Sequence, residues 1–431
     1  MARTEECILY RNFDNGEVLD IMTSLMNSYE AGEEGFENRK EEFFHMAGSL
    51  VEMAGMYGFS GNLWHTYLTQ LLVNHENAFS TASEIRGVVE GSINHLALHD
   101  FGIFKELYDF DLAVFDSAFG TDCADFLCNY VNTGCNSKVY NQRICDRICD
   151  MSKTLAEAST VEEFMADMVQ FYKDFGVGKL GLNKAFRIEH GKDGKPVITP
   201  ITRIAHVNLD DLVGYEIPKQ KLIENTEAFV RGRKANNCLL FGDAGTGKSS
   251  SIKGILNRYY DEGLRIIEVY KHQFQDLNDV IAQIKNRNYK FILYMDDLSF
   301  EEFEIEYKYL KAVIEGGLEK KPDNILIYAT SNRRHLVRET FKDKADRDEE
   351  LHTNDTVQEK LSLVARFGVT IYFGKPDKKE FQKIVTTLAD RYGVEMEEEK
   401  LLLEANKWEL SHGGLSGRTA QQFIDYLLGQ Q

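Results

Sequence analysis

The sequence predicts an all-α N-terminal part followed by an α/β part, with a parallel sheet and a helical C-terminal segment. Three observations predict this division. The first half has apolar residues near the 3.6-residue helical period and no proline before residue 196. The second half alternates short apolar runs with helical segments, which is typical of a parallel sheet covered by helices. The net charge is −15 over residues 1–195 and −4 over the remainder.

Composition limits the class of protein. At 431 residues, with 43% hydrophobic and 28% charged residues, the chain has room for two or three domains. No apolar signal core or stretch of membrane-spanning length is visible, and seven cysteines form no secreted-domain framework. We therefore expect a cytoplasmic protein without membrane contact. The acidity argues against broad nucleic-acid capture by the first domain, for which we expect an unknown protein partner. Nucleic-acid binding by the second half stays open.

The first domain is predicted over residues 1–184 and is helical almost throughout. Asn62 and Thr160 are expected helix N-caps, the latter with Glu163 at the third helical position. The histidines are scattered without a metal-ligand pattern. The predicted helices are Glu17–Tyr29, Arg39–Met56, Leu63–Phe79, Ser83–Leu98 and Lys138–Ala156.

Five cysteines lie within 27 residues of this domain: Cys123, Cys128, Cys135, Cys145 and Cys149. Cys145 and Cys149 are one helical turn apart and would share a face. Four thiolates would suit zinc or an iron–sulfur cluster, but the spacings are not paired C-x₂-C knuckles. Buried core cysteines are the alternative interpretation, because free cysteine is among the most buried residue types.

A hairpin linker is predicted over residues 185–202. Two short apolar runs, at residues 186–188 and 197–198, flank Gly191-Lys192-Asp193-Gly194, which is a turn signal. The hairpin marks the expected boundary between the domains.

The segment after the apolar run 237–241 is a complete phosphate-binding loop. Its glycines allow backbone N–H groups to turn toward an anion, and the following helix adds its positive end. Lys248 would reach the β- and γ-phosphates, and the Ser249 hydroxyl would bind Mg²⁺. The predicted phosphate-binding residues are Gly242, Asp243, Ala244, Gly245, Thr246, Gly247, Lys248, Ser249 and Ser250.

Two further apolar runs end in polar residues that suit the same ligand. Phe291 to Met295 leads into Asp296 and Asp297. Because ligands of doubly wound sheets bind at the carboxyl ends of strands, Asp296 is expected to bind Mg²⁺ through water. Asp297 lies where a water-activating base is needed. The second run, residues 324–331, leads into Asn332, which would orient the attacking water.

Two arginines complete the set. Arg366 precedes the apolar run Val369–Phe373 and has a guanidinium suited to phosphate. Arg418 opens the last amphipathic helix, where the helix dipole disfavours a cation, and this local cost points to a ligand.

In this order, these motifs resemble the AAA+ ATPases over residues 203–431. The resemblance implies a P-loop, a Walker B pair at Asp296 and Asp297, sensor 1 at Asn332, an arginine finger at Arg366 and sensor 2 at Arg418. It also implies that the entry segment Leu209–Tyr215, with Val213 and Gly214, wraps the adenine. The implied ligands are ATP and Mg²⁺.

The same resemblance implies a five-stranded parallel sheet sandwiched by helices over residues 203–375. A helical lid over residues 376–431 would follow, with helices at Lys379–Tyr392, Glu397–Trp408 and Gly417–Leu428. The segments Asp296–Glu301, Ala329–Leu336 and Ser416–Arg418 resemble more closely the bacterial family named domain of unknown function 815, which is described as predicted AAA+ ATPases.

Three hypotheses for function stay open. The first is ATP hydrolysis that drives a conformational change on a protein or nucleic-acid target, with Arg366 acting in trans within a homo-oligomer formed through the AAA+ domain. The second is an ATP-dependent switch or scaffold with little hydrolysis, because Walker B ends Asp-Asp instead of the usual Asp-Glu. The third is a DNA remodelling or loading factor.

Three further features are weaker signals. Tyr270-Lys271-His272 is a poor match to the aromatic–glycine pore loop of threading unfoldases. Arg333 and Arg334 would contact phosphate or a neighbouring subunit, or would form surface ion pairs. The charged stretch 339–358 is expected to be a solvated loop.

Overall fold

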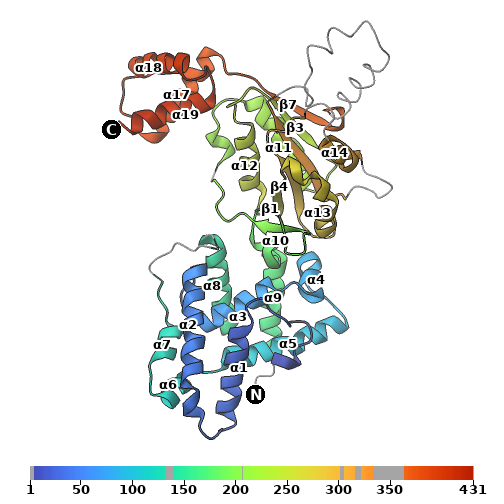
Figure 1. Ribbon diagram of the computed structural model, residues 1–431, viewed down its shortest axis with the longest axis vertical. Coiled ribbons are helices and arrows are strands. Elements are labelled where there is room, and N and C mark those ends of the chain that lie inside the picture. Colours follow the sequence, from blue (N-terminus) through green and yellow to red (C-terminus); the bar gives the residue numbers. More distant parts are fainter. Residues whose placement is uncertain are drawn as a thin grey trace. The chain divides into compact units, whose positions relative to one another are not determined.

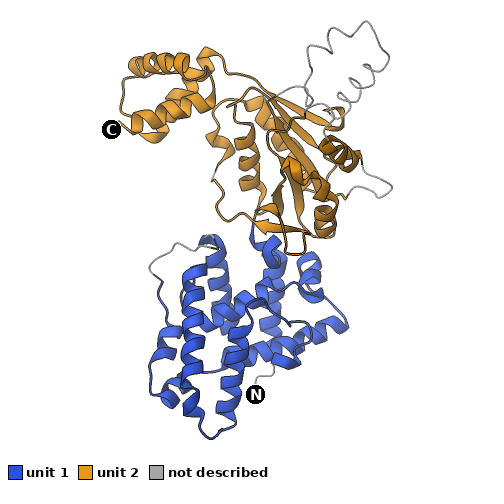
Figure 2. Ribbon diagram, in the orientation of Figure 1, with its two compact units in different colours: residues 1–183 blue, residues 184–431 orange. Residues whose placement is uncertain are grey.

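The protein has two compact units, residues 1–183 and 184–431, in a computed structural model (Figures 1 and 2). The structure describes residues 4–132, 139–140, 142–205, 207–300, 305–315, 322–332 and 364–430. Cys135, Arg333, Arg334 and the stretch 339–358 lie outside the described residues. The predictions on them are therefore not tested.

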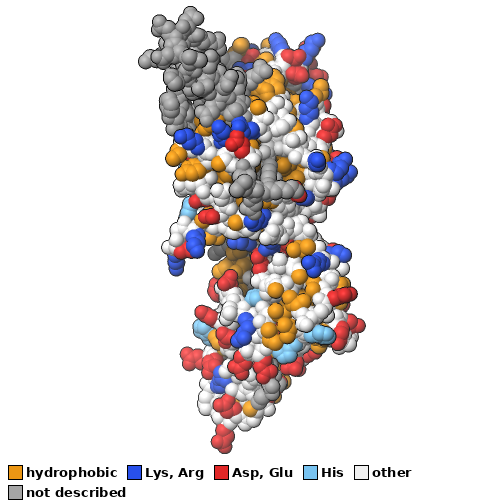
Figure 3. All heavy atoms as spheres, turned by 90° about the vertical axis from the view of Figure 1, so that its right-hand side faces the viewer, with side chains coloured by type: hydrophobic (Ala, Val, Ile, Leu, Met, Phe, Trp, Pro, Cys, Tyr) orange, Lys and Arg blue, Asp and Glu red, His pale blue; other side chains and the backbone are white. Residues whose placement is uncertain are grey.

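Unit 1 is helical, as the sequence predicts. Figure 3 shows many acidic side chains over its visible face, in accord with the net charge of the first half. In the part of the chain that the structure describes, no helix is long and apolar enough to cross a membrane. The α-helices are α1 (Glu17–Glu30), α2 (Lys40–Tyr57), α3 (Leu63–Asn74), α4 (Ala78–Arg86), α5 (Ser92–Asp109), α6 (Ala113–Phe119), α7 (Cys123–Cys128), α8 (Gln142–Glu157), α9 (Val161–Phe175) and α10 (Gly178–Leu182), with 3₁₀ turns at η1 (Thr4–Glu6) and η2 (Phe36–Arg39).

Side-chain caps fix several helix starts. Asn62 accepts a hydrogen bond from the His65 N–H, and Thr160 accepts one from the Glu163 N–H, so both predicted N-caps are confirmed. The helix predicted to run to Phe79 is wrong at its end, because Asn77 forms a capping box and starts α4.

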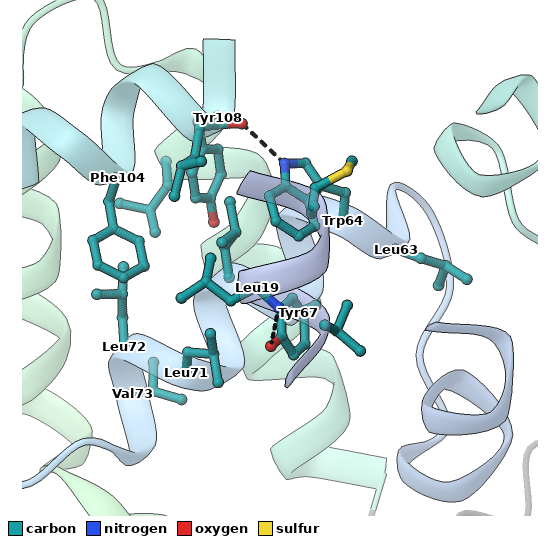
Figure 4. Packing of buried hydrophobic residues seen from close by; sticks show 14 of the residues in the cluster. Leu19, Leu63, Trp64, Tyr67, Leu71, Leu72, Val73, Phe104 and Tyr108 are labelled. Atoms are coloured by element: carbon teal, nitrogen blue, oxygen red, sulfur yellow. Dashed lines mark hydrogen bonds between the residues drawn. The ribbon is translucent and has the colours of Figure 1, made fainter. Parts of the chain in front are cut away.

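The core of unit 1 is built from aromatic and aliphatic side chains of several helices (Figure 4). Trp64 is fully buried, and its indole N–H donates to the Leu107 carbonyl at 2.9 Å. The Tyr67 hydroxyl accepts from the Leu19 N–H at 3.1 Å and so ties α3 to α1. The polar atoms of these large side chains are thus satisfied inside an apolar cluster.

Unit 2 is built on a seven-stranded sheet. Its strands are β1 (Ala185–His190), β2 (Pro196–Pro200), β3 (Cys238–Gly242), β4 (Leu264–Glu268), β5 (Lys290–Met295), β6 (Ile325–Ser331) and β7 (Val369–Phe373). They lie in the order β2-β1-β4-β5-β6-β3-β7. The strands from β3 to β7 pair in parallel, and β3, which leads into the phosphate-binding motif, lies between β6 and β7.

The number of strands corrects the prediction of a five-stranded sheet. The hairpin expected as a linker does form, with Ile188 opposite Ile198. Its first strand also pairs in parallel with β4, where Phe186 lies opposite Ile267. The hairpin covers the open edge of β4, and an uncovered edge would expose unpaired backbone groups.

Helices cover both faces of this sheet (Figure 1). They are α11 (Glu216–Val230), α12 (Lys248–Tyr259), α13 (Leu277–Ile284) and α14 (Ile305–Glu315), with 3₁₀ turns at η3 (Leu209–Asp211) and η4 (Lys271–Asp276). Alternate strand residues, such as Leu240, Tyr294 and Tyr328, pack with α11 and α12 in one apolar cluster.

The C-terminal helices α17 (Lys378–Tyr392), α18 (Glu398–Ser411) and α19 (Gly417–Leu428) pack around a core of their own. Asp377 forms a capping box with Glu380, and Ser416 caps α19 through the Thr419 N–H. Val213, from the segment before α11, packs against this helical core.

Candidate functional site

The phosphate-binding motif forms a strand–loop–helix turn between β3 and α12. Gly242, Gly245 and Gly247 all have positive φ, at 139°, 76° and 88°. A Cβ on Gly242 would lie 2.0 Å from the Phe373 carbonyl oxygen, so only glycine fits beside β7. The loop therefore bends where the sequence places its glycines, and it presents backbone N–H groups at the start of α12.

Lys248 is the first residue of α12 and has only 6% of its surface exposed. Its Nζ donates to the carbonyls of Gly242 at 3.1 Å and Asp243 at 2.6 Å. Burial lowers the pKa of Lys248, although the neighbouring carboxylates of Asp243, Asp297 and Asp296 act in the opposite direction. The ammonium is held by two neutral carbonyls, which leaves its charge available for an anion.

Asp296 follows β5 and meets the start of α12. Its Oδ1 accepts hydrogen bonds from Ser249 Oγ at 2.8 Å, the Tyr294 hydroxyl at 2.7 Å and Thr330 Oγ1 at 2.5 Å. Burial acts to raise the pKa of Asp296, but these hydroxyl donors outweigh it, and the pKa lies below the ordinary value. The carboxylate is therefore ionised and fixed in place beside Ser249.

Asp297 and Asn332 meet at the ends of neighbouring strands. Asn332 Nδ2 donates to Asp297 Oδ1 at 2.8 Å. Asp297 has a φ of 50°, in the left-handed region, and its N–H donates to Thr330 Oγ1 at 3.0 Å. This conformation is uncommon for a non-glycine residue and turns the chain sharply after Asp296.

A cavity of about 800 Å³ joins these residues to the C-terminal helices. Arg418 lines it, and the Arg418 N–H donates to the Gly245 carbonyl at 3.2 Å. Its volume is in the range of small-ligand sites. The predicted site residues on its wall are Val213, Ala244, Gly245, Thr246, Gly247, Lys248, Ser249, Ser250, Asp296, Asp297, Asn332 and Arg418.

Four predicted residues do not line this cavity. Gly242 and Asp243 line an adjoining cavity, which Asn332 also borders. Gly214 lies between Val213 and Tyr215, which do line the main cavity, but is not itself on its wall. Arg366 is ion-paired with Glu315 of α14, away from the cavity wall.

The apolar lining of the cavity was expected in part, from the segment Leu209–Tyr215, but Phe373, Ile384 and Leu388 were missed. Leu212, Tyr215 and Phe373 line it together with Ile384 and Leu388 of α17. Phe373, at the end of β7, and the two α17 residues lie far from the phosphate-binding loop in the sequence, so no local pattern signals them. They form a surface suited to a flat, apolar group such as a nucleobase.

Tyr294 and Thr330 were missed as well, although a local signal exists for Tyr294. It stands near the end of β5, two positions before Asp296, which directly follows the strand, and this spacing favours side chains on the same side.

The cysteines that the structure describes in unit 1 contribute to its packing. Cys145 is buried, and its Sγ donates to the Gly58 carbonyl at 2.8 Å. Cys123, Cys128 and Cys149 pack against the apolar cluster of the unit. Among the residues that the structure describes, no group of three or more Cys, His, Asp or Glu side chains is arranged to hold a metal ion.

The P-loop, the paired carboxylates and the helical lid on a largely parallel sheet define the class: this is an AAA+ ATPase fold. Residues 182–431 match the model of the family described as "Protein of unknown function (DUF815)". The chain belongs to this family. No curated protein matches the chain.

Among solved structures, a point mutant of Thermotoga maritima RuvB is similar, with 18% identity and a TM-score of 0.37; the alignment covers 52% of this chain and 65% of that chain. The T. maritima RuvB Holliday junction branch migration motor has 16% identity and a TM-score of 0.33, with 51% and 72% of the two chains covered. The FIGL-1 AAA domain in complex with ADP has 17% identity and a TM-score of 0.36, with 52% and 74% covered. The chain thus spans just under two thirds of the first of these structures.

Proposed function

We propose that unit 2 binds Mg-ATP and hydrolyses it to ADP and phosphate, and that the protein uses this cycle to change the conformation of a protein or nucleic-acid target. The observation that carries the proposal is the meeting of Lys248, Ser249, Asp296, Asn332 and Arg418 around one cavity. These residues come from strands, a helix start and the lid, and their donors and charges suit a triphosphate.

The residues fit Mg²⁺ as well as the nucleotide. The Ser249 hydroxyl and the Asp296 carboxylate are oxygen ligands 2.8 Å apart, and Mg²⁺ in such sites takes few protein ligands and keeps several waters. When bound, the ion neutralises charge on the β- and γ-phosphates. Ser249 would bind it directly and Asp296 through water.

In the proposed reaction, a water oxygen attacks the γ-phosphorus and the bond from that phosphorus to the bridging oxygen breaks. Asp297 accepts the proton of the water, and Asn332 orients Asp297 and the water. Lys248 and Arg418 stabilise the negative charge that is carried by the phosphate oxygens. The lid residue Arg418 would thereby couple the lid to the nucleotide state.

A second candidate function is an ATP-dependent switch with little hydrolysis. Asp297 favours it, because its carboxylate is shorter than the usual glutamate and is already bound to Asn332. We also propose a homo-oligomer, a cytoplasmic location and a protein partner for unit 1. These three proposals rest on the sequence alone.

Phosphate release from the purified protein tests the two candidates. We expect Asp297→Asn to keep nucleotide affinity within about twofold and to lower turnover about 10²- to 10⁴-fold, because general-base catalysis typically contributes that much. Asp297→Glu restores the longer arm and serves as the comparison. Turnover in the wild type no higher than in Asp297→Asn would contradict hydrolysis and support the switch.

A further inference from the structure

One oxygen of the Asp296 carboxylate is surrounded by three hydroxyl groups. Ser249, Tyr294 and Thr330 all donate to Oδ1, at 2.5 to 2.8 Å. They come from the start of α12, from β5 itself and from the neighbouring strand β6. Hydrogen bonds to an ionised acceptor are the strong ones, so this arrangement fixes the orientation of the carboxylate.

The ring of Tyr294 is held by the core. Its side chain is only 5% exposed and packs in the cluster between the sheet and α11 and α12. The hydroxyl donates to Asp296, the residue that directly follows β5, at 2.7 Å. Burial of the ring leaves it little rotational freedom, and the hydroxyl donates from a fixed point.

Thr330 connects the Asp296 carboxylate and the backbone of Asp297 to β6. Its hydroxyl donates to Asp296 and accepts from the Asp297 N–H at 3.0 Å. Its carbonyl accepts from the Leu298 N–H at 2.7 Å. Thr330 thus bonds three successive residues of the turn after β5, Asp296, Asp297 and Leu298.

Binding of Mg²⁺ would change the hydrogen bonds of the three donors differently. Ser249 would have to turn its hydroxyl from Asp296 to the ion, as proposed above. We assign no contact with the ion to Tyr294 or Thr330. They would hold the Asp296 carboxylate in one position both before and after Ser249 leaves it.

We propose that Tyr294 is a positioning residue of the magnesium site: with Thr330, it keeps the Asp296 carboxylate oriented for the Mg²⁺ of the nucleotide complex. This inference rests on the proposed function. Outer-shell hydrogen bonds of this kind typically contribute about 10- to 100-fold in metal affinity.

Binding of a fluorescent ATP analogue to the full chain, titrated with Mg²⁺ at fixed analogue concentration, tests the inference. Tyr294→Phe should raise the half-saturating Mg²⁺ concentration about 10-fold or more. Binding of the analogue in EDTA should change less than about twofold, because the Tyr294 hydroxyl bonds Asp296 and Ser249, the two residues proposed to hold Mg²⁺, whereas Lys248 is held by the carbonyls of Gly242 and Asp243. Thr330→Val is the second variant and should shift the Mg²⁺ titration in the same direction.

Tyr328→Phe is the matched control. Tyr328 lies directly opposite Tyr294 in the sheet, is fully buried in the same cluster, and donates its hydroxyl to neither carboxylate. Its hydroxyl bonds instead with Thr226 at 3.0 Å and Asn225 at 2.9 Å. This variant removes the same atom from the same side of the sheet, so its Mg²⁺ titration should match that of the wild type.

The outcomes separate this inference from the proposed function. If the wild type binds the analogue no better with Mg²⁺ than in EDTA, the proposed Mg-ATP site itself is contradicted. If the wild type depends on Mg²⁺ but Tyr294→Phe titrates at the same concentration, the positioning role is overturned. Equal shifts of the Mg²⁺ titration in Tyr294→Phe and Tyr328→Phe would also overturn it. The effect would then come from a general change in the packing of the sheet and not from the hydrogen bond to Asp296.

Discussion

At the scale of single residues, the charge of Lys248 is the most consequential feature of the cavity. Its ammonium is buried and bonded only to carbonyl oxygens in the contacts described, at 3.1 and 2.6 Å. Lys248→Met keeps most of the volume and removes the charge. We expect nucleotide affinity to fall about 10- to 100-fold, since a hydrogen bond to a charged group contributes about 1.5–3 kcal/mol. Isothermal titration calorimetry with Mg-ATP measures this.

Lys253→Met is the control for that experiment. Lys253 lies on the same helix, α12, with its side chain exposed to solvent. Its replacement should leave the affinity unchanged. An equal loss of affinity in both variants would show that general electrostatic attraction, and not the P-loop geometry, binds the nucleotide.

At the scale of elements, one buried carboxylate attaches the N-terminal segment of unit 1 to α5. Asp100 is fully buried and accepts hydrogen bonds from the N–H groups of Ile8, Leu9 and Tyr10, at 2.7 to 3.0 Å. These three residues form no ladder of their own, so the carboxylate satisfies their backbone donors.

Asp100→Ala would leave these N–H groups without their acceptor. We expect the free energy of unfolding of unit 1 to fall by about 2–3 kcal/mol, because each unsatisfied buried donor is costly. Urea denaturation of the full chain, followed by circular dichroism, measures the loss. Glu106→Ala, at an exposed position of the same helix, should cost less than about 0.5 kcal/mol. Similar losses in both variants would contradict the role of Asp100.

At the scale of the whole molecule, Arg366 is the residue whose role depends on assembly. It is paired with Glu315 and does not line the cavity of its own chain. If it acts in trans, Arg366→Ala should bind ATP normally and lose about 10³-fold or more in turnover. The specific activity of the wild type should rise with protein concentration, and phosphate release measured over a concentration series checks this.

A mixture of Lys248→Met and Arg366→Ala gives a second test of whether Arg366 acts in trans. Lys248→Met keeps Arg366 and Arg366→Ala keeps Lys248, so if Arg366 acts in trans, a mixture should regain activity that neither variant has alone. Activity independent of concentration, together with no recovery on mixing, would contradict a finger acting in trans.

The sequence predicted a large part of the α/β unit. The bends at Gly242 and the buried strand before Asp296 depend on local patterns, and the structure has them where expected. The helix boundaries near Asn77 were missed, because a side-chain cap interrupts an apolar pattern that continues through it. The place of β1 beside β4 was missed too, since strand pairing over a long sequence distance leaves no local signal.

By itself, the sequence determined the order of the elements, the glycine-rich anion loop and the identity of the charged residues near it. These follow from short-range chemistry: glycine permits positive φ, and apolar periodicity sets the buried face. Only the tertiary structure decided which hydroxyls orient Asp296, which apolar side chains close the cavity, and that Arg366 turns to Glu315. Those contacts join residues far apart in the chain, and packing of the whole unit selects them.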